Sequence, residues 1–259
     1  MRKRRNYKKV LIAVISAVLC LITAFGLTAC GKKDGSDGDG GTKVSDKEWQ
    51  KRLSWEDCES YTYETWNNIT EYSAKLKSDP SVSVAYSVNG IDKIDLKNNK
   101  SCDMIEYVFK DETIDIYDTE LADRPNDYIK VSDGVYRSIV SYEAKVGDLW
   151  YEISRKYDND GKFTGWQGEV QGSHTDVGKL QTETLSMYKT LRSMYTYDKE
   201  TGMYTMNIEG TNFMKISFPS AGGVIIVSGT GDEAVAYQYY HSKNATTVTL
   251  PEWEIKTES

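Results

Sequence analysis

Apolar and polar residues alternate along most of the chain. Every second residue is valine or tyrosine between positions 82 and 88, and segments 105–109 and 204–208 repeat this period of two. Such alternation is typical of strands that bury one face and expose the other to water. The sequence therefore predicts a fold built mostly from antiparallel strands.

Short polar segments separate neighbouring strand candidates. Asp133-Gly134 lies between YIKVS and VYRSIVSY, and Asp-Gly is a strong signal for a two-residue hairpin turn. Asn98-Asn99 and segment 158–161 divide further strand candidates. We expect a hairpin at each of these three places.

Two segments have helical rather than strand-like spacing. Ser45 and Glu48 fit a capping box, which predicts a short helix over about residues 46–54. Between His174 and Tyr195, apolar residues recur at spacings of three to five and predict a long amphipathic helix. An apolar sheet face needs a cover, and this helix can supply it. We predict an α+β fold, mostly antiparallel β, in which a strongly curved sheet (a half-barrel) holds the long helix on its concave face.

The start of the chain has a different composition from the rest. Six basic residues lie within the first nine positions, and residues 10–29 carry no charge. A basic flank followed by an apolar run is the layout of a secretory signal. A run of about 20 apolar residues is also long enough to span a bilayer as a helix. The end of the run favours the first interpretation.

That end, Leu27-Thr28-Ala29-Cys30, resembles the lipobox of bacterial lipoproteins. The resemblance implies that Leu27, Thr28 and Ala29 are recognised by a signal peptidase, with Gly31 as the small residue after the cut. It implies that the Cys30 thiol receives a diacylglyceryl group. The expected location is the extracytoplasmic face of the cell membrane, where two acyl chains anchor a protein stably.

This interpretation divides the chain into three parts. Residues 1–29 form the signal peptide, the Gly/Asp-rich residues 30–43 form a flexible tether, and residues 44–259 form a single β-rich extracytoplasmic domain. Six of the 32 basic residues belong to the signal, so 26 basic and 39 acidic residues remain, a net charge of about −13. Such a charge argues against binding nucleic acid, which needs clustered Lys and Arg. The protein is expected to be a monomer.

Few residues offer catalytic or metal chemistry. His174 and His241 are the only histidines and lack zinc-ligand spacing, so we expect no metal, no cofactor and no enzymatic activity. Cys58 and Cys102 remain after removal of the signal and lipidation of Cys30. Outside the cytoplasm they are candidates for a disulfide. The alternative is that both are small core residues.

The second half of the domain suggests a relationship. The helix between residues 174 and 195, the strands YTYDKETGMYTMNI and VAYQYY, and the closing TTVTLPEW resemble Gram-positive lipoproteins related in fold to the lipoprotein-carrier half-barrels of the LolA/LolB and LppX type. This resemblance implies an apolar cavity that holds acyl chains, without assigning any ligand-contacting residue. The expected function is therefore to bind or carry an apolar or amphiphilic ligand, such as a lipid.

The aromatic composition supports a second hypothesis. The chain contains 19 tyrosines and six tryptophans against five phenylalanines. Cross-strand packing accounts for most such residues in a sheet, but exposed Tyr and Trp also bind sugars and partner proteins. The alternative function is an interaction module for cell-wall glycan or another envelope protein. The exposure of Trp66, Trp150, Trp166 and Trp253 discriminates between the two hypotheses.

Overall fold

A computed structural model describes residues 43–67, 71–122, 124, 127–172, 174, 176–208, 212–230 and 234–256. The predicted signal peptide, the lipobox with Cys30 and Gly31, and all of the tether except Lys43 lie outside the described residues.

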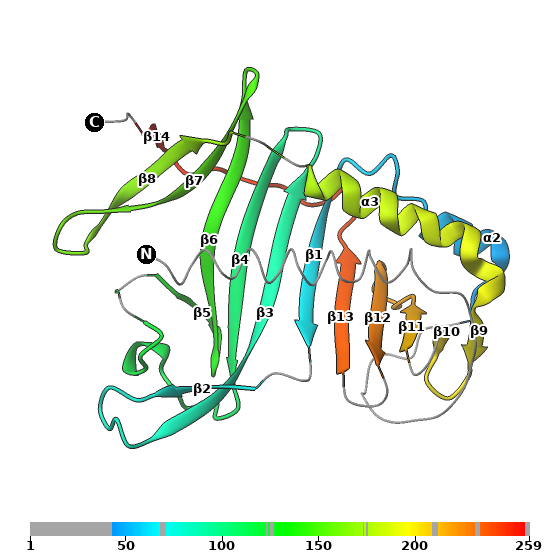
Figure 1. The fold of residues 1–259 in the computed structure, drawn as a ribbon, viewed down its shortest axis with the longest axis horizontal. Helices are drawn as coiled ribbons and strands as arrows, with labels where there is room; N and C mark the ends of the chain where they lie inside the picture. The colour runs from blue at the N-terminus through cyan, green and yellow to red at the C-terminus, as the bar shows by residue number, and fades with distance from the viewer. Residues whose placement is uncertain are drawn as a thin grey trace.

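The described chain is dominated by one antiparallel sheet of 14 strands (Figure 1). Its order is β14-β8-β7-β6-β4-β3-β1-β13-β12-β11-β10-β9, and only β14 is parallel to its neighbour. Strand β2 pairs with β3 and β5 pairs with β6 outside this path, and the sheet does not close on itself. The strands are β1 Ser60–Asn67, β2 Tyr72–Lys75, β3 Ser83–Asp95, β4 Lys100–Phe109, β5 Ile129–Ser132, β6 Val135–Val146, β7 Leu149–Tyr157, β8 Phe163–Val170, β9 Thr196–Asp198, β10 Met203–Asn207, β11 Asn212–Ser217, β12 Val224–Thr230, β13 Ala234–His241 and β14 Glu254–Ile255.

The predicted helices form close to their expected bounds. Helix α2 (Asp46–Arg52) starts at the capping box, where the Ser45 hydroxyl accepts the N–H of Glu48 at 3.2 Å. Helix α3 (Val177–Met187) continues into the 3-10 helix η2 (Tyr188–Met194), and a shorter 3-10 helix, η1, covers Ile116–Asp118. The mostly antiparallel fold with one short and one long helix is therefore confirmed.

All three predicted hairpin turns are also confirmed. They connect β5 to β6, β3 to β4, and β7 to β8. Gly134, Asn99 and Gly161 in these turns have φ values of 67°, 53° and 78°, a region that glycine and asparagine tolerate best.

The strand register sorts the side chains onto two faces, because residues directly opposite on antiparallel neighbours point to the same side. Tyr61 on β1 lies opposite Ile94 on β3, and both belong to the core cluster that includes α2 and α3. We call this side the helix face. Ile91 lies opposite Met104 on the other side, which we call the rear face.

The two largest core clusters lie on different faces of the sheet. On the helix face, α2 and α3 contribute Trp49 and Leu185 to a cluster over β1 and β10–β13. On the rear face, the C-terminal segment, residues 242–253, contributes Val248 to a cluster over β3, β4, β6 and β7. Figure 1 shows α3 along the β13–β9 side and the C-terminal segment, in red, crossing the strands to reach β14. A third cluster on the helix face packs Ile116 of η1 against the opposite ends of β3, β4 and β6.

The structure corrects the prediction that Cys58 and Cys102 could form a disulfide. Both are free and buried, Cys58 in the helix-face cluster and Cys102 in the rear-face cluster. The clusters lie on opposite sides of the sheet, so the thiols do not meet. The alternative, that both are small core residues, holds, and burial raises the pKa of the Cys102 thiol to about 12.

Candidate functional site

The space between the helices and the sheet is filled with aromatic side chains. Trp49 has no exposed surface, and its ring centroid lies 5.3, 5.0 and 5.4 Å from those of Tyr195, Tyr204 and Phe218. The Tyr61 hydroxyl lies 2.8 Å from the Gly178 carbonyl oxygen, and burial raises the pKa of Tyr61 well above its ordinary value. The described residues thus pack this interface as a core.

Two hollows of the described surface lie elsewhere. One, of about 510 Å³, is lined only by polar residues of α2 and η2, including Asp46 and Lys189. The other, of about 360 Å³, lies at the ends of β1, β3 and β4, where its lining includes Asn67, Ser87 and Val108.

The four tryptophans that discriminate between the two hypotheses are all half-buried, whereas Trp49 and Trp55 are buried. Three of the four contact structural partners. Trp150 stacks on His174, with ring centroids 3.6 Å apart, and Trp166 packs edge-on against Tyr142. Trp253 covers the backbone of Gly168, where a Cβ would overlap its ring. Trp66 and Trp150 belong to none of the three core clusters, but the Trp150 ring is covered by His174.

Trp66 belongs to an aromatic ladder on the rear face. Strands β1 and β13 pair so that Trp66 lies opposite Tyr237 and Glu64 lies opposite Tyr239. These pairs alternate along the strands with pairs such as Tyr63 and Tyr240, which point to the helix face, so they point to the rear face. The Trp66 and Tyr237 rings are parallel within 3°, with centroids 5.1 Å apart. We define the rear aromatic ladder as Trp66, Tyr237, Tyr239 and His241.

Polar contacts hold the other end of the ladder. The rings of Tyr239 and His241 stack with centroids 4.5 Å apart. His241 Nε2 lies 3.2 Å from Glu64 Oε1, and the Tyr239 hydroxyl donates to the Gly222 carbonyl at 3.0 Å. These contacts fix ring orientation while the rings stay half-buried, which suits a preformed binding surface.

A row of hydrogen-bonded polar side chains continues from Trp66 across the next strands. Asn89 on β3 lies opposite Glu106 on β4, which lies opposite Arg137 on β6. The Asn89 amide donates to Glu106 Oε1 at 3.1 Å, and Arg137 Nε donates to Glu106 Oε2 at 2.7 Å. Thr65 faces Gly90, and continuing that register places Trp66 beside Asn89. We call Asn89, Glu106 and Arg137 the polar row.

A pair of carboxyl groups lies on the helix face at the edge of the main cluster. Asp92 on β3 is opposite Asp103 on β4, and opposite the buried Tyr63 on β1. Burial raises the pKa of Asp92 well above its ordinary value, and the charges of Asp103 and Glu143 raise it further. Two such close carboxyl groups favour sharing one proton. Among the described residues, no three His, Cys, Asp or Glu side chains are grouped to hold a metal ion.

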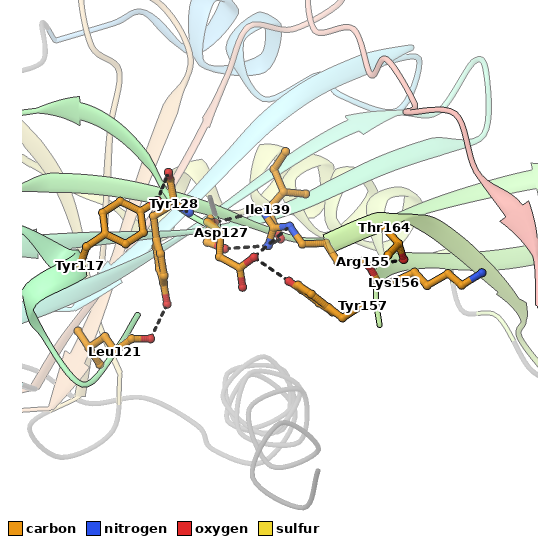
Figure 2. A network of polar contacts seen from close by, with 10 residues as sticks. Tyr117, Leu121, Asp127, Tyr128, Ile139, Arg155, Lys156, Tyr157 and Thr164 are labelled. Carbon is orange, nitrogen blue, oxygen red and sulfur yellow. Dashed lines mark hydrogen bonds and ion pairs between the residues drawn. The ribbon is translucent and has the colours of Figure 1, made fainter. Parts of the chain in front are cut away.

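Arg155, a half-buried arginine that no pattern in the sequence singled out, joins two parts of the sheet (Figure 2). Strand β6 pairs with β5 near Arg137 and with β7 from Tyr142 onward, which leaves a gap in its ladder between them. Arg155 fills the gap by donating to the Ile139 carbonyl at 2.8 Å and the Asp127 carbonyl at 3.1 Å.

The same arginine fixes the loop before β5. The Tyr157 hydroxyl donates to Asp127 Oδ1 at 2.7 Å, and Arg155 Nε lies 3.9 Å from that oxygen. Burial, followed by this hydrogen bond, raises the pKa of Tyr157. Figure 2 shows these side chains converging between β7 and the loop. We interpret the network as structural, because its hydrogen bonds join groups of the chain itself and tie the loop to β6 and β7.

Comparisons with protein-family models, curated proteins and solved structures find no match to this chain. Within the described residues, neither α2 nor α3 is both long and apolar enough to cross a bilayer. The function is therefore inferred from geometry and chemistry.

Proposed function

We propose that the protein is a lipid-anchored, extracytoplasmic and non-enzymatic module that binds envelope glycan through the rear aromatic ladder. The observation that supports this most directly is the position of Trp66. It is half-buried, outside the core clusters, stacked on Tyr237, and next to the polar row. Aromatic rings beside fixed hydrogen-bonding groups are the usual means of recognising sugars, which have apolar ring faces and polar rims.

The proposed anchor is a diacylglyceryl group on Cys30, followed by the tether of residues 30–43. Its support is the lipobox-like sequence and the acidic composition of the mature chain, which an anionic membrane surface repels. Replacing Cys30 with serine removes the acceptor thiol. We expect Cys30→Ser to leave the protein unprocessed and without the mass of a diacylglyceryl group, measured by mass spectrometry of the intact protein. A normal lipid mass on the variant would refute the anchor.

Binding is tested with the intact lipoprotein in detergent micelles, by co-sedimentation with insoluble cell-wall polysaccharide. We expect the wild type to sediment with the glycan, and Trp66→Ala to lose about tenfold in affinity because a stacking surface is removed. Trp150→Ala is the matched control, since it removes another half-buried tryptophan that stacks on His174 instead. Equal loss in both variants, or no binding by the wild type, would refute the proposal.

A second proposal keeps the carrier function, with the sheet curved as a half-barrel around α3. The open ends of the sheet at β14 and β9 and the single long helix favour it. Its ligand would have to displace the side chains that pack Trp49 and its neighbours, or bind elsewhere on the sheet. Mass spectrometry of protein purified without detergent tests this, and the consistent absence of bound lipid would refute it.

A further inference from the structure

We infer that the glycan site is a cradle between Trp66 and the polar row, and that it selects a neutral sugar polymer. This inference rests on the proposed glycan-binding function and adds the position of the sugar ring, the residues that contact it, and the charge of the ligand.

Trp66 can offer only one face of its ring to a ligand, because Tyr237 stacks on the other. Neighbouring strands lie about 4.8 Å apart, close to the 5.1 Å between the Trp66 and Tyr237 centroids, so these two rings stack in the direction that crosses the strands. Tyr237 on β13 covers one face of Trp66. The opposite face is therefore turned toward β3, the neighbour of β1 on its other side. A pyranose ring stacked on that face lies directly over Asn89.

The polar row forms the floor beneath that sugar ring. Asn89 and Glu106 are half-buried on the rear face, and their mutual hydrogen bond and the Arg137 contact hold the amide and carboxylate in one orientation. Amide, carboxylate and guanidinium groups retain donor and acceptor capacity beyond these two bonds. Vicinal hydroxyls of a sugar match such a preorganised row, because each hydroxyl both donates and accepts.

A hollow lies beside the cradle on the same two strands, β3 and β4. Ser87 and Val108 are the opposed pair two residues along from Asn89 and Glu106, so they share the rear face. They line the hollow of about 360 Å³ at the end of β1. This hollow, which is also lined by the ion-paired Lys110 and Glu71, adjoins the cradle along β3 and β4 and gives a second sugar of the same chain a place to bind.

The charges of the cradle and of the mature chain determine which kind of polymer it favours. Within the cradle, the Glu106 carboxylate is paired with Arg137, and Glu64 on the same face contacts His241. The mature chain after Cys30 carries a net charge of about −13, because 26 basic and 39 acidic residues remain. An anionic polymer meets long-range repulsion without a compensating free cation in the row, whereas a neutral glycan meets neither. The cradle therefore favours a neutral chain.

The test measures binding of soluble N-acetylglucosamine oligosaccharides, a neutral probe, and of polyglycerol phosphate, an anionic probe, by calorimetry on the intact lipoprotein in micelles. We expect the neutral probe to bind the wild type at least tenfold more tightly. Glu106→Gln keeps the side-chain volume but loses the charge that holds Arg137, and we expect it to bind the neutral probe about fivefold more weakly. Glu59→Gln is the control, because Glu59 forms a comparable 2.9 Å ion pair with Lys97 in an exposed position.

The outcomes separate this inference from the proposed function. In one outcome, Trp66→Ala weakens binding, but Glu106→Gln binds as tightly as the wild type and the Glu59→Gln control. The ladder would then bind glycan without help from the polar row, and the inference would be overturned. Tighter binding of the anionic probe also overturns it. If neither probe binds but insoluble cell-wall glycan is retained through Trp66, the proposed function stands and the neutral cradle does not. Thermal unfolding of each variant confirms that it is folded.

Discussion

The two halves of the sheet are covered in different ways. The β1 and β13–β9 half is covered on the helix face by α2 and α3, two regular helices. The β3–β8 half is covered on the rear face by the C-terminal segment, which has little regular structure and must find partners on the sheet. Strand β3 belongs to both halves, since Ile94 points to one cluster and Ile91 to the other.

This difference shows how a large sheet can bury apolar surface without two complete layers of helices. Because side chains alternate along a strand, β3 supplies both clusters from one backbone. The segment cover is tied down at points along its length: Asn244 N donates to the Ser60 carbonyl at 2.6 Å, and the Thr62 and Thr246 hydroxyls lie 3.0 Å apart. We expect the helix-covered half to contribute more stability and the segment-covered half to be easier to open.

The largest loss of stability is expected from a substitution in the core of the helix-covered half. Trp49→Ala removes a fully buried ring that contacts three other aromatic rings, and large-to-small changes of this kind cost about 3–5 kcal/mol. Urea unfolding should show a lower midpoint than for the wild type. Trp66→Ala is the comparison, since it truncates a half-buried tryptophan on the rear face and should cost less than half as much. Equal losses would contradict the assignment of Trp66 to a binding surface.

A smaller effect is expected from loosening the segment-covered half. In Gly168→Ala the added methyl group would overlap the Trp253 ring, and overpacking of this kind costs about 1–3 kcal/mol. Faster amide hydrogen exchange in residues 242–253 than in α3 would show that the segment opens separately. Gly172→Ala is the control, because a Cβ there meets open space. Uniform exchange changes across both halves would instead show a single cooperative unit.

The third prediction concerns Asp92, where β3 passes between the two halves. Its pKa is raised in the folded protein, first by burial and then by Asp103, so protonation favours folding. The stability that protonated Asp92 contributes is fully present below the ordinary carboxyl pKa. It is lost as the pH rises through the raised pKa of Asp92 in the folded protein. Asp92→Asn mimics the protonated form, so we expect higher thermal stability than wild type at neutral pH and a flatter profile toward alkaline pH.

The control for that prediction is Asp79→Asn. Asp79 is exposed, and hydrogen bonds from Ser81 lower its pKa, so its stabilising contribution exists above the ordinary value and disappears on acidification. The two variants should therefore change the pH profile in opposite directions. The shared-proton interpretation would be contradicted if the thermal stability of the wild type did not change between acid and neutral pH and matched that of Asp92→Asn throughout.

Local signals in the sequence predicted the local structure well. The Ser45 capping box, the Asp133-Gly134 turn and the apolar spacing before Tyr195 each depend on residues close together in the chain, and each matches the structure. The sequence could not decide whether Cys58 and Cys102 pair, because their placement on opposite faces of the sheet depends on strand register. Strand register between distant segments also determines that Ile94 and Ile91 of β3 contribute to core clusters on opposite faces of the sheet.

The candidate site was only partly predictable. Trp66 was among four tryptophans whose exposure was expected to matter, but the sequence did not distinguish it from the other three. Its stacking on Tyr237 and its position beside Asn89 arise from pairing of β1 with β13 and β3, which no local pattern encodes. Arg155 was missed for the same reason, since its partners lie on β6 and in the loop before β5.

The pairing of β1 with β13 also constrains how the chain can fold. Thr62 and Thr246, which share a hydrogen bond, are 184 residues apart, and β1 lies in the middle of the sheet between β3 and β13. A chain that emerges N-terminus first therefore holds one edge of β1 unpaired until nearly all of the domain has appeared. Contacts of such long range slow folding, and an unpaired strand edge is prone to join other chains. Until β13 arrives, keeping β1 from aggregating depends on other factors, such as a chaperone or rapid completion of the chain.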